Sequence, residues 1–476
     1  MTSFNGSNNI IDMSDLDDGS NSAITIQKMD GENNSFVMDL DNNNRNNSDM
    51  LYIKDGNATI GVKVIGKING LENITKDNGL RFATVGEGIK LGSIETSDGE
   101  IIVKGVEGGF YNTDLYVERQ DYDKDSIYNE SFNGGEDLAD KKPGSDSVEE
   151  FFGENLDEAQ NLVIVNSKVS DISKNGHAVL TLSKVNYGNA IYMDRLNKRM
   201  GEVGYLDGDE GIWVRIRHDR IGKDNAFRSQ NTMYEIGYDV KQQKDSGEHR
   251  IGMALDYMDG KTTFSEVNGT GEVTRKGLWL YDTWMGNSGH YRDFVAKWGH
   301  LANDYQFESV AGETTGEFSN NVFSVSAEFG KKNDIGSSWY FEPQVQMQFA
   351  HATGSSYKTT LLGAALTDVN NDAFNSCIAR AGFRLGRDLN DVSTVYFKGD
   401  VLHEFLGEQE IYAKDGTTAG KWSKVEYNNS GTWYDLGFGF ATKINESSYA
   451  YFDFEKSFGN NNEDTYQINA GMQWSF

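Results

Sequence analysis

The chain ends with Thr465–Phe476, TYQINAGMQWSF, in which apolar and polar or small side chains alternate without exception. One face of an extended strand would carry Tyr466, Ile468, Ala470, Met472, Trp474 and Phe476. The stretch has about the length that a tilted strand needs to cross a bilayer, roughly 9 to 11 residues. Aromatic side chains stand near both of its ends, as in the girdles of membrane barrels. The pattern predicts the closing strand of a transmembrane β-barrel.

Similar alternating runs precede this stretch from Gly208 onward, and with it they number twelve. Their centres lie near Val214, Ile236, Met253, Leu280, Ala296, Val325, Val345, Ala381, Phe397, Phe438, Phe452 and Ala470. The polar faces carry charges of both signs, at Arg215, Glu235, Asp239, Arg250, Asp256, Lys297, Glu328, Arg380, Arg384, Lys398, Asp400, Glu404, Asp435, Asp453 and Glu455. Charges inside and apolar residues outside favour a barrel surrounded by lipid, with water or a plug within. A barrel of about twelve strands is wide enough for about one helix.

One segment with a convincing helical pattern, Gly188–Val203, precedes these runs. Its basic residues Arg195, Lys198 and Arg199 cluster at helical spacing. An amphipathic helix packed on a core is one interpretation. The other is a helix threaded through the barrel, and because unpaired charges in a confined space are costly, lumen acids would then face the cluster. The acids that we expect there are Glu342, Asp435 and Glu455.

The N-terminal part has a different sequence pattern. From Ser22 to about Arg119 it consists of short β-like runs separated by Gly, Asn and Asp clusters. Such runs favour a β-solenoid, in which each coil packs on the next. An acidic insertion at 120–160 interrupts this series of β-like runs, and we expect strands again at Leu162–Lys168 and His177–Ser183.

Composition narrows the classes of partner and compartment. With 73 acidic against 44 basic residues the net charge is −29, which argues against nucleic acid as a partner. The single cysteine, Cys377, excludes an internal disulfide. No run of about 18 apolar residues occurs, so no membrane-spanning helix is expected. The start, Met1–Asn9, lacks the features of a signal peptide, and we expect the natural N-terminus to lie further upstream.

No residue pattern indicates a metal, a cofactor or a catalytic site. Asp39, Asp41 and Asn43 alternate as in a calcium loop, but Asn44 and Met50 stand where that loop needs Gly and Glu. A solvated polar turn is the better interpretation. The seven histidines show no ligand spacing, and no G-x-S-x-G motif occurs.

The order of parts resembles the classical autotransporters of type V secretion. In the barrel, the landmarks of this resemblance are NKRMG at Asn197–Gly201, GIWVR at Gly211–Arg215, GYD at Gly237–Asp239, EPQVQ at Glu342–Gln346, RAGFRLG at Arg380–Gly386 and the final Phe476. Upstream, Ser35–Gly66 is similar to the end of a pertactin-like passenger. The elements that match are the D-x-L-x-I-x-x-G turn from Asp49 to Gly56 and the run from Ala58 to Val64.

The resemblance implies an all-β protein in three parts. These are the end of a solenoid passenger with an autochaperone-like segment (1–183), a linker helix that plugs the lumen (184–204) and a 12-stranded barrel (205–476). The implied function is a Gram-negative outer-membrane translocator that exports its own passenger and anchors it outside the cell. The implied partners are outer-membrane lipid, the barrel assembly machinery, which reads Trp474 and Phe476, and periplasmic chaperones. We expect a monomer without cofactors.

Two alternatives from other classes stay open. In the first alternative, the chain is an adhesin whose binding passenger lies mostly upstream. In the second, it is an outer-membrane hydrolase whose site uses lumen carboxylates. Charged lumen residues are expected in any such barrel, so we do not expect an enzyme.

The linker also bears on whether the passenger is released. In one autotransporter subgroup an Asn-Asn pair stands just before Leu-Asn-Lys-Arg-Met-Gly, and the first asparagine cyclises and breaks the chain. Here Leu196–Gly201 reproduces the hexapeptide, but Asp194 and Arg195 precede it. Aspartate thus stands where this subgroup needs the asparagine that cyclises, so we expect the passenger to stay attached.

The terminal aromatic residue provides a first test. Replacing Phe476 with Asp is expected to lower the amount of barrel in the outer membrane well below wild type, since the resemblance makes this residue part of the assembly signal. The amount is measured as heat-modifiable protein in isolated outer membranes. A wild-type amount in the Phe476→Asp variant would place the signal elsewhere.

Overall fold

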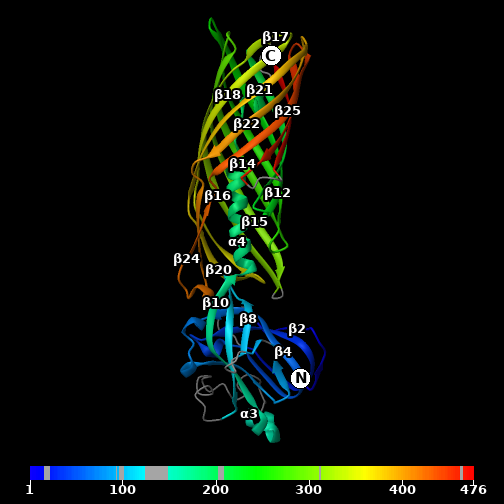
Figure 1. Ribbon diagram of the computed structural model, residues 1–476, viewed down its shortest axis with the longest axis vertical. Helices are drawn as coiled ribbons and strands as arrows, with labels where there is room; N and C mark the ends of the chain where they lie inside the picture. The colour runs from blue at the N-terminus through cyan, green and yellow to red at the C-terminus, as the bar shows by residue number, and fades with distance from the viewer. Residues whose placement is uncertain are drawn as a thin grey trace.

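The computed structural model describes residues 1–14, 22–92, 94–95, 101–123, 148–201, 208–309, 312–460 and 465–476. A β-rich N-terminal part and a long barrel lie end to end, and helix α4 (Lys174–Ala190) runs from one into the other (Figure 1). The C-terminus lies at the end of the barrel far from the N-terminal part (Figure 1). In the described residues, no helix combines the length and the apolar character needed to cross a membrane.

The barrel is one antiparallel sheet that closes on itself. Its segments are β11 (Glu210–Lys223), β12 (Phe227–Lys244), β13 (Gly247–Phe264), β14 (Gly269–Gly286), β15 (His290–Ser309), β16 (Gly312–Lys331), β17 (Asn333–Gly336), β18 (Trp339–Ala352), β19 (Ser355–Leu361), β20 (Ala364–Asn371), β21 (Phe374–Asn390), β22 (Ser393–Glu404), β23 (Glu408–Lys414), β24 (Ser423–Asn428), β25 (Gly431–Asn445), β26 (Ser448–Phe458) and β27 (Tyr466–Ser475). Five of the segments extend a neighbouring one after a short break, so the described residues form twelve strands. Residues 211–220 of β11 pair with 466–475 of β27 and close the cylinder. The predicted barrel is confirmed.

The two faces of each strand are as different as the alternation indicated. In β18, Phe349 is 50% exposed on the outer face and its neighbour Gln348 is 1% exposed on the inner face. The same contrast runs along β25, where Phe438 is exposed and Asp435 is buried. All the charged residues assigned to polar faces from the sequence are buried in the barrel interior. The outer wall is therefore apolar and the interior is ionic.

The N-terminal part stacks its strands in parallel and then ends in an antiparallel sheet. Its strands are β1 (Phe4–Asn5), β2 (Ile10–Asp12), β3 (Ala23–Asp41), β4 (Met50–Asn69), β5 (Leu80–Val85), β6 (Ile89–Leu91), β7 (Ile94–Glu95), β8 (Ile101–Glu107), β9 (Tyr111–Asp121) and β10 (Gln160–Ile172). The long strands β3 and β4 pair in parallel, whereas β8, β9 and β10 pair antiparallel. Ile26, Phe36, Leu51 and Ile53 belong to one buried core that runs along the stack. This arrangement is consistent with the end of a solenoid.

The helix prediction was wrong in its bounds. The last two residues of the predicted helix Gly188–Val203 lie outside the described residues, and up to Gly201 the chain forms α4 (Lys174–Ala190) and the short α5 (Leu196–Met200) instead of one helix. Residues 177–183, expected as a strand, are helical, so the boundary placed between 183 and 184 falls inside α4. The reason is burial: nearly every residue of α4 is buried, so no apolar stripe at helical spacing marks it in the sequence. A local cap does mark its start, because the Ser173 hydroxyl accepts a hydrogen bond from the Gly176 N–H (3.0 Å).

Most of the acidic insertion expected at 120–160 lies outside the described residues, which resume at Val148. From there, α3 (Val148–Phe152) and a short 3₁₀ segment (Gly153–Glu158) lead into β10. Phe151 and Phe152 pack with Met50 and Tyr52 in a small core beside the stack.

The closed barrel predicts heat-modifiable behaviour. The full chain folded in detergent is expected to migrate differently on an SDS gel before and after boiling, because SDS does not open a fully paired barrel without heat. Circular dichroism of the unboiled sample should be dominated by β-structure. Identical migration together with little β-structure would contradict the fold.

Candidate functional site: the charged lumen and its linker

Helix α4 occupies the half of the lumen next to the N-terminal part (Figure 1). Its polar side chains bond to the inner wall: the Asn303 amide donates to Asn186 (3.0 Å), and the Asn231 amide donates to Asn189 (2.9 Å). On another side of the helix, the Tyr187 hydroxyl donates to Glu404 (3.0 Å). The helix is thus bonded to the wall on more than one side.

After Ala190 the chain leaves the helix and becomes a buried linker, residues 191–200. The wall holds its backbone directly: Gln346 donates to the carbonyl of Asp194 (2.7 Å), and Glu328 accepts from the N–H of Leu196 (3.0 Å). The Tyr451 hydroxyl reaches the last turn, donating to the carbonyls of Lys198 and Arg199 (3.0 and 2.9 Å). Side chains of the wall therefore satisfy backbone groups that a continued helix would have paired internally.

Arg195 is the centre of the largest ion cluster on the linker. Its guanidinium lies 2.6 Å from Asp400, 3.1 Å from Asp435 and 3.1 Å from Glu455. Lys198 also binds Glu455, at 2.8 Å. All five side chains are almost fully buried. One linker cation thus compensates carboxylates from three different strands.

A second cluster surrounds Asp194 and Arg199. The Asp194 carboxylate accepts from Arg215 (2.9 Å) and lies 3.6 Å from Arg199. Arg199 binds Asp293 at 2.7 Å and stacks over the Tyr281 ring at 4.3 Å. The linker therefore supplies charges of both signs, each placed against its opposite on the wall.

The acids singled out from the sequence have different positions. Asp435 and Glu455 lie against the basic cluster, but Glu342 does not. Glu342 is buried in the lumen and pairs with Arg384 of the adjacent strand at 2.6 Å. Glu342 faces the lumen as expected, but the expectation that it pairs with the basic cluster was wrong, because cross-strand pairing with Arg384 already satisfies its charge.

The sequence reasoning missed several residues of the site. Asp400 and Asp293 bind the linker most closely, yet Asp400 is only one of many polar-face charges in the sequence, Asp293 is not among them, and Tyr451 carries no signal. In the sequence, Asp194 bears on chain cleavage, and nothing there marks it as an ion-pair partner. A charge count of the linker hexapeptide and the residues before it would indicate Asp194, since an acid next to a basic cluster in a confined lumen needs its own partners.

Trp474 lies on the outer face of β27 and Phe476 follows the strand directly, and both side chains are exposed. The backbone of Phe476 still pairs with Glu210 at the start of the first strand (3.0 and 3.2 Å). Within the described part of the chain, no group of His, Cys, Asp and Glu side chains is arranged to hold a metal ion. The arrangement is suited to holding a polypeptide in a pore.

The Arg195 cluster generates a stability prediction. Replacing Arg195 with Met leaves buried carboxylates short of a cation, and such a loss typically costs about 3–5 kcal/mol. The midpoint temperature of the heat-modifiable transition should fall clearly. Lys424→Met is the matched control, since Lys424 pairs with Glu410 and Glu426 at an exposed site outside the lumen. Adding Asp435→Asn to Arg195→Met should recover part of the loss, and equal midpoints in all variants would contradict the role of the cluster.

Comparison of the sequence with known protein families and relatives also indicates an autotransporter barrel. A family model described as Autotransporter beta-domain matches residues 210–455, more than half of the 476-residue chain. The "Serine protease pet autotransporter" of Escherichia coli O44:H18 (strain 042 / EAEC) is 27% identical over 292 residues, which are 60% of this chain and 22% of the relative. The "Pertactin autotransporter" of Bordetella parapertussis is 25% identical over 290 residues, 59% of this chain and 30% of the relative. The aligned part thus spans less than a third of these relatives.

Similar solved structures include two autotransporter domains. The β domain of the Bordetella autotransporter Brka aligns with a TM-score of 0.45 and 21% identity, covering 56% of this chain and 100% of that one. The transport unit of the autotransporter AIDA-I from Escherichia coli aligns with a TM-score of 0.46 and 14% identity, covering 64% and 99%. On the family match and the closed twelve-stranded barrel, the chain belongs to the autotransporter β-domain family of outer-membrane translocators.

Proposed function

We propose that this translocator remains the covalent surface anchor of its own N-terminal part, which lies outside the cell. The observation that carries the proposal is the path of the chain, which enters the lumen as α4 and is held there by the buried ion pairs of residues 191–200. Such a connection ties the N-terminal part to the membrane through a continuous polypeptide.

Contacts at the rim support a passenger seated on the barrel. Asp415, between β23 and β24, accepts a hydrogen bond from the N–H of Phe110 at 2.6 Å. The Tyr111 hydroxyl lies 2.6 Å from that of Ser423, and Val37 of β3 packs on Leu361 of β19. These bonds join the base of the N-terminal part to hairpins at the end of the barrel where α4 enters (Figure 1).

The linker chemistry argues against release by the chain itself. The position where cyclisation would begin holds Asp194, and its pairing with Arg215 and Arg199 favours the charged carboxylate. Cleavage by this route needs a side-chain amide nitrogen that attacks the residue's own backbone carbonyl and expels the next residue's nitrogen, and the carboxylate of Asp194 has no such nitrogen. The Arg195 side chain is itself held by three acids, so it does not activate Asp194.

The partners follow from the exterior of the barrel and from its assembly. Outer-membrane lipid surrounds the apolar wall, the barrel assembly machinery acts on the strand that ends in Trp474 and Phe476, and periplasmic chaperones accompany the chain before insertion. The closed sheet leaves no strand edge for self-association through strand pairing, which favours a monomer. The net charge of −29 disfavours nucleic acid.

The activity of the passenger is a separate matter. Several relatives are named serine proteases, but the aligned region spans about a fifth of them, 22% in the "Serine protease pet autotransporter". Their named activity is therefore not transferred to this chain. A surface-display or adhesive role suits a passenger that stays attached.

Mass spectrometry of the outer-membrane protein tests the anchor. We expect one polypeptide that contains both the N-terminal part and the barrel, and protease added to intact cells should remove the N-terminal part while leaving the barrel. A barrel fragment that starts near Arg195 in untreated membranes would contradict permanent attachment. An N-terminal part that resists protease on intact cells, yet is cleaved after lysis, would contradict its position outside the cell.

A further inference from the structure

The apolar outer wall of the barrel ends at one level on the side of the N-terminal part. On each strand, one outward-facing residue marks the end of the apolar outer face. We call these twelve residues together the boundary ring. Its members are His218, Thr232, Asp259, Lys276, His300, Asn321, His351, Asn375, His403, Thr432, Lys456 and Tyr466. Phe405 and Phe458 are the next outward-facing residues beyond the ring on their strands, and they add exposed aromatic side chains at this edge of the apolar wall.

Strand register shows that these residues form a level ring. Many neighbours are direct cross-strand partners, including His218 with Thr232, and His300 with both Lys276 and Asn321. At the other strand pairs, a ring residue on one strand pairs directly with a residue two or four positions away from the ring residue on the next strand. For example, His351 pairs with Phe323, which is two positions from the ring residue Asn321. All these offsets shift the register in the same direction along the barrel axis. This is expected because the strands are tilted, so residues at one height around the barrel are staggered from strand to strand.

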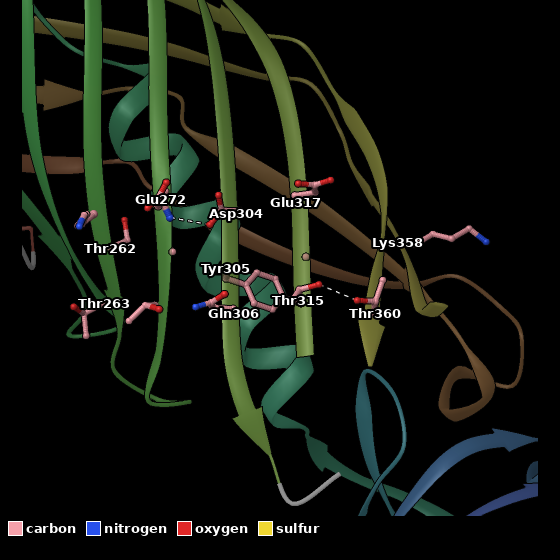
Figure 2. A pocket seen from close by; sticks show the side chains of 14 residues that line it. Thr262, Thr263, Glu272, Asp304, Tyr305, Gln306, Thr315, Glu317, Lys358 and Thr360 are labelled. Carbon is pink, nitrogen blue, oxygen red and sulfur yellow. Dashed lines mark hydrogen bonds between the residues drawn. The ribbon is translucent and has the colours of Figure 1, made fainter. Parts of the chain in front are cut away.

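The chemistry of the wall changes at this ring. On the barrel side of it, the exposed residues are large and apolar, such as Trp298 on β15 and Phe323 on β16. On the other side, the acidic residues Glu272, Asp304 and Glu317 help to line a cavity of about 760 Å³ (Figure 2). Because acyl chains cover the apolar zone, the ring lies at the depth of lipid headgroups.

The ring contains four of the seven histidines, and all four are bonded in the same way. In each, Nδ1 contacts a neutral side chain of the next strand: Thr232 for His218 (3.2 Å), Asn321 for His300 (3.2 Å), Asn375 for His351 (2.9 Å) and Thr432 for His403 (2.7 Å). Among the described residues, no hydrogen bond engages Nε2 of these four imidazoles. In the described part of the chain, each of these imidazoles therefore keeps one ring nitrogen that no protein group engages.

Histidines elsewhere are placed differently. His177 on α4 lies 2.7 Å from Glu266, and His249 at the opposite end of the barrel lies 3.0 Å from Asp282. Each of these two imidazoles therefore faces a carboxylate of the protein. The ring histidines have neutral partners, so their added charge stays available to an external anion.

Within the ring, the charged groups near the four histidines include more basic side chains than acidic ones. Lys276 stands directly opposite His300, and Tyr466 packs 6.2 Å from the His218 ring, with Arg220 two positions along the same strand. His351 is flanked by Phe323 and Asn375, and His403 by Ala379 and Thr432, all of them uncharged. Lys456 is the second lysine of the ring, and Asp259 is its one acid.

We infer that the boundary ring binds the phosphate groups of anionic lipids in the leaflet next to the N-terminal part, and binds them more tightly in mild acid. Histidine is the side chain whose charge ordinarily changes between about pH 5 and 8, and a basic residue at a membrane surface attracts anionic headgroups. The two lysines supply a constant attraction to which the histidines add. This inference rests on the proposed function in one respect, that the barrel spans a membrane with this end at a lipid surface.

Bromolipid quenching of tryptophan fluorescence tests the inference, because Trp298 lies on the outer wall one outward position from His300. The full chain is placed in phosphatidylcholine vesicles with brominated phosphatidylglycerol, whose single charge does not change in this range. Its association relative to brominated phosphatidylcholine should rise about fivefold between about pH 8 and about pH 5.5. Changing all four ring histidines to Gln should abolish the rise and leave the weaker preference that the lysines supply.

The matched control is His249→Gln with His290→Gln, at the opposite end of the barrel, which should keep the full rise. Unboiled migration on an SDS gel verifies the barrel in every sample. If the quadruple variant does not fold, His300→Gln and His403→Gln singly should each lose part of the rise. A flat wild-type profile, or an undiminished rise in a folded ring variant, overturns the inference without bearing on covalent anchoring, which mass spectrometry tests separately.

Discussion

Inside a membrane every backbone N–H and C=O must find its partner within the protein, because hydrocarbon offers none. This constraint explains why the last strand returns to the first and why pairing extends to the final residue, where Phe476 exchanges two backbone hydrogen bonds with Glu210. Once the sheet closes, the side-chain period of two places one face of each strand toward lipid and the other toward the lumen. The apolar wall and the ionic interior are both consequences of closure.

Closure also creates the problem that the linker solves. The interior holds many carboxylates and guanidiniums that are cut off from bulk water, and a buried charge is tolerated only when it is paired. The wall pairs some of them across strands, as Arg384 does for Glu342. The linker completes others, with Arg195 placed among Asp400, Asp435 and Glu455. Linker and wall are therefore one electrostatic unit, which is a physical reason for the chain to remain in the pore.

The two ends of the outer wall have different chemistry. Toward the N-terminal part, the apolar zone ends in neutral-partnered histidines and two lysines. At the far end, His249 faces Asp282, and the closing strand finishes in Trp474 and Phe476. The same barrel thus presents different surfaces to the two leaflets, although its strands cross both.

The sequence alone determined the features that depend on neighbours along the chain. The alternation in Thr465–Phe476 and in the other runs predicted twelve strands and their lipid-facing residues, since pleating is a local property. Tertiary structure decided the rest. Helix α4 is buried on nearly every side and so carried no stripe. The choice of Asp400 over Glu342 as partner of Arg195, and the alignment of four distant histidines at one height, depend on strand tilt and register around a closed sheet, which no local pattern encodes.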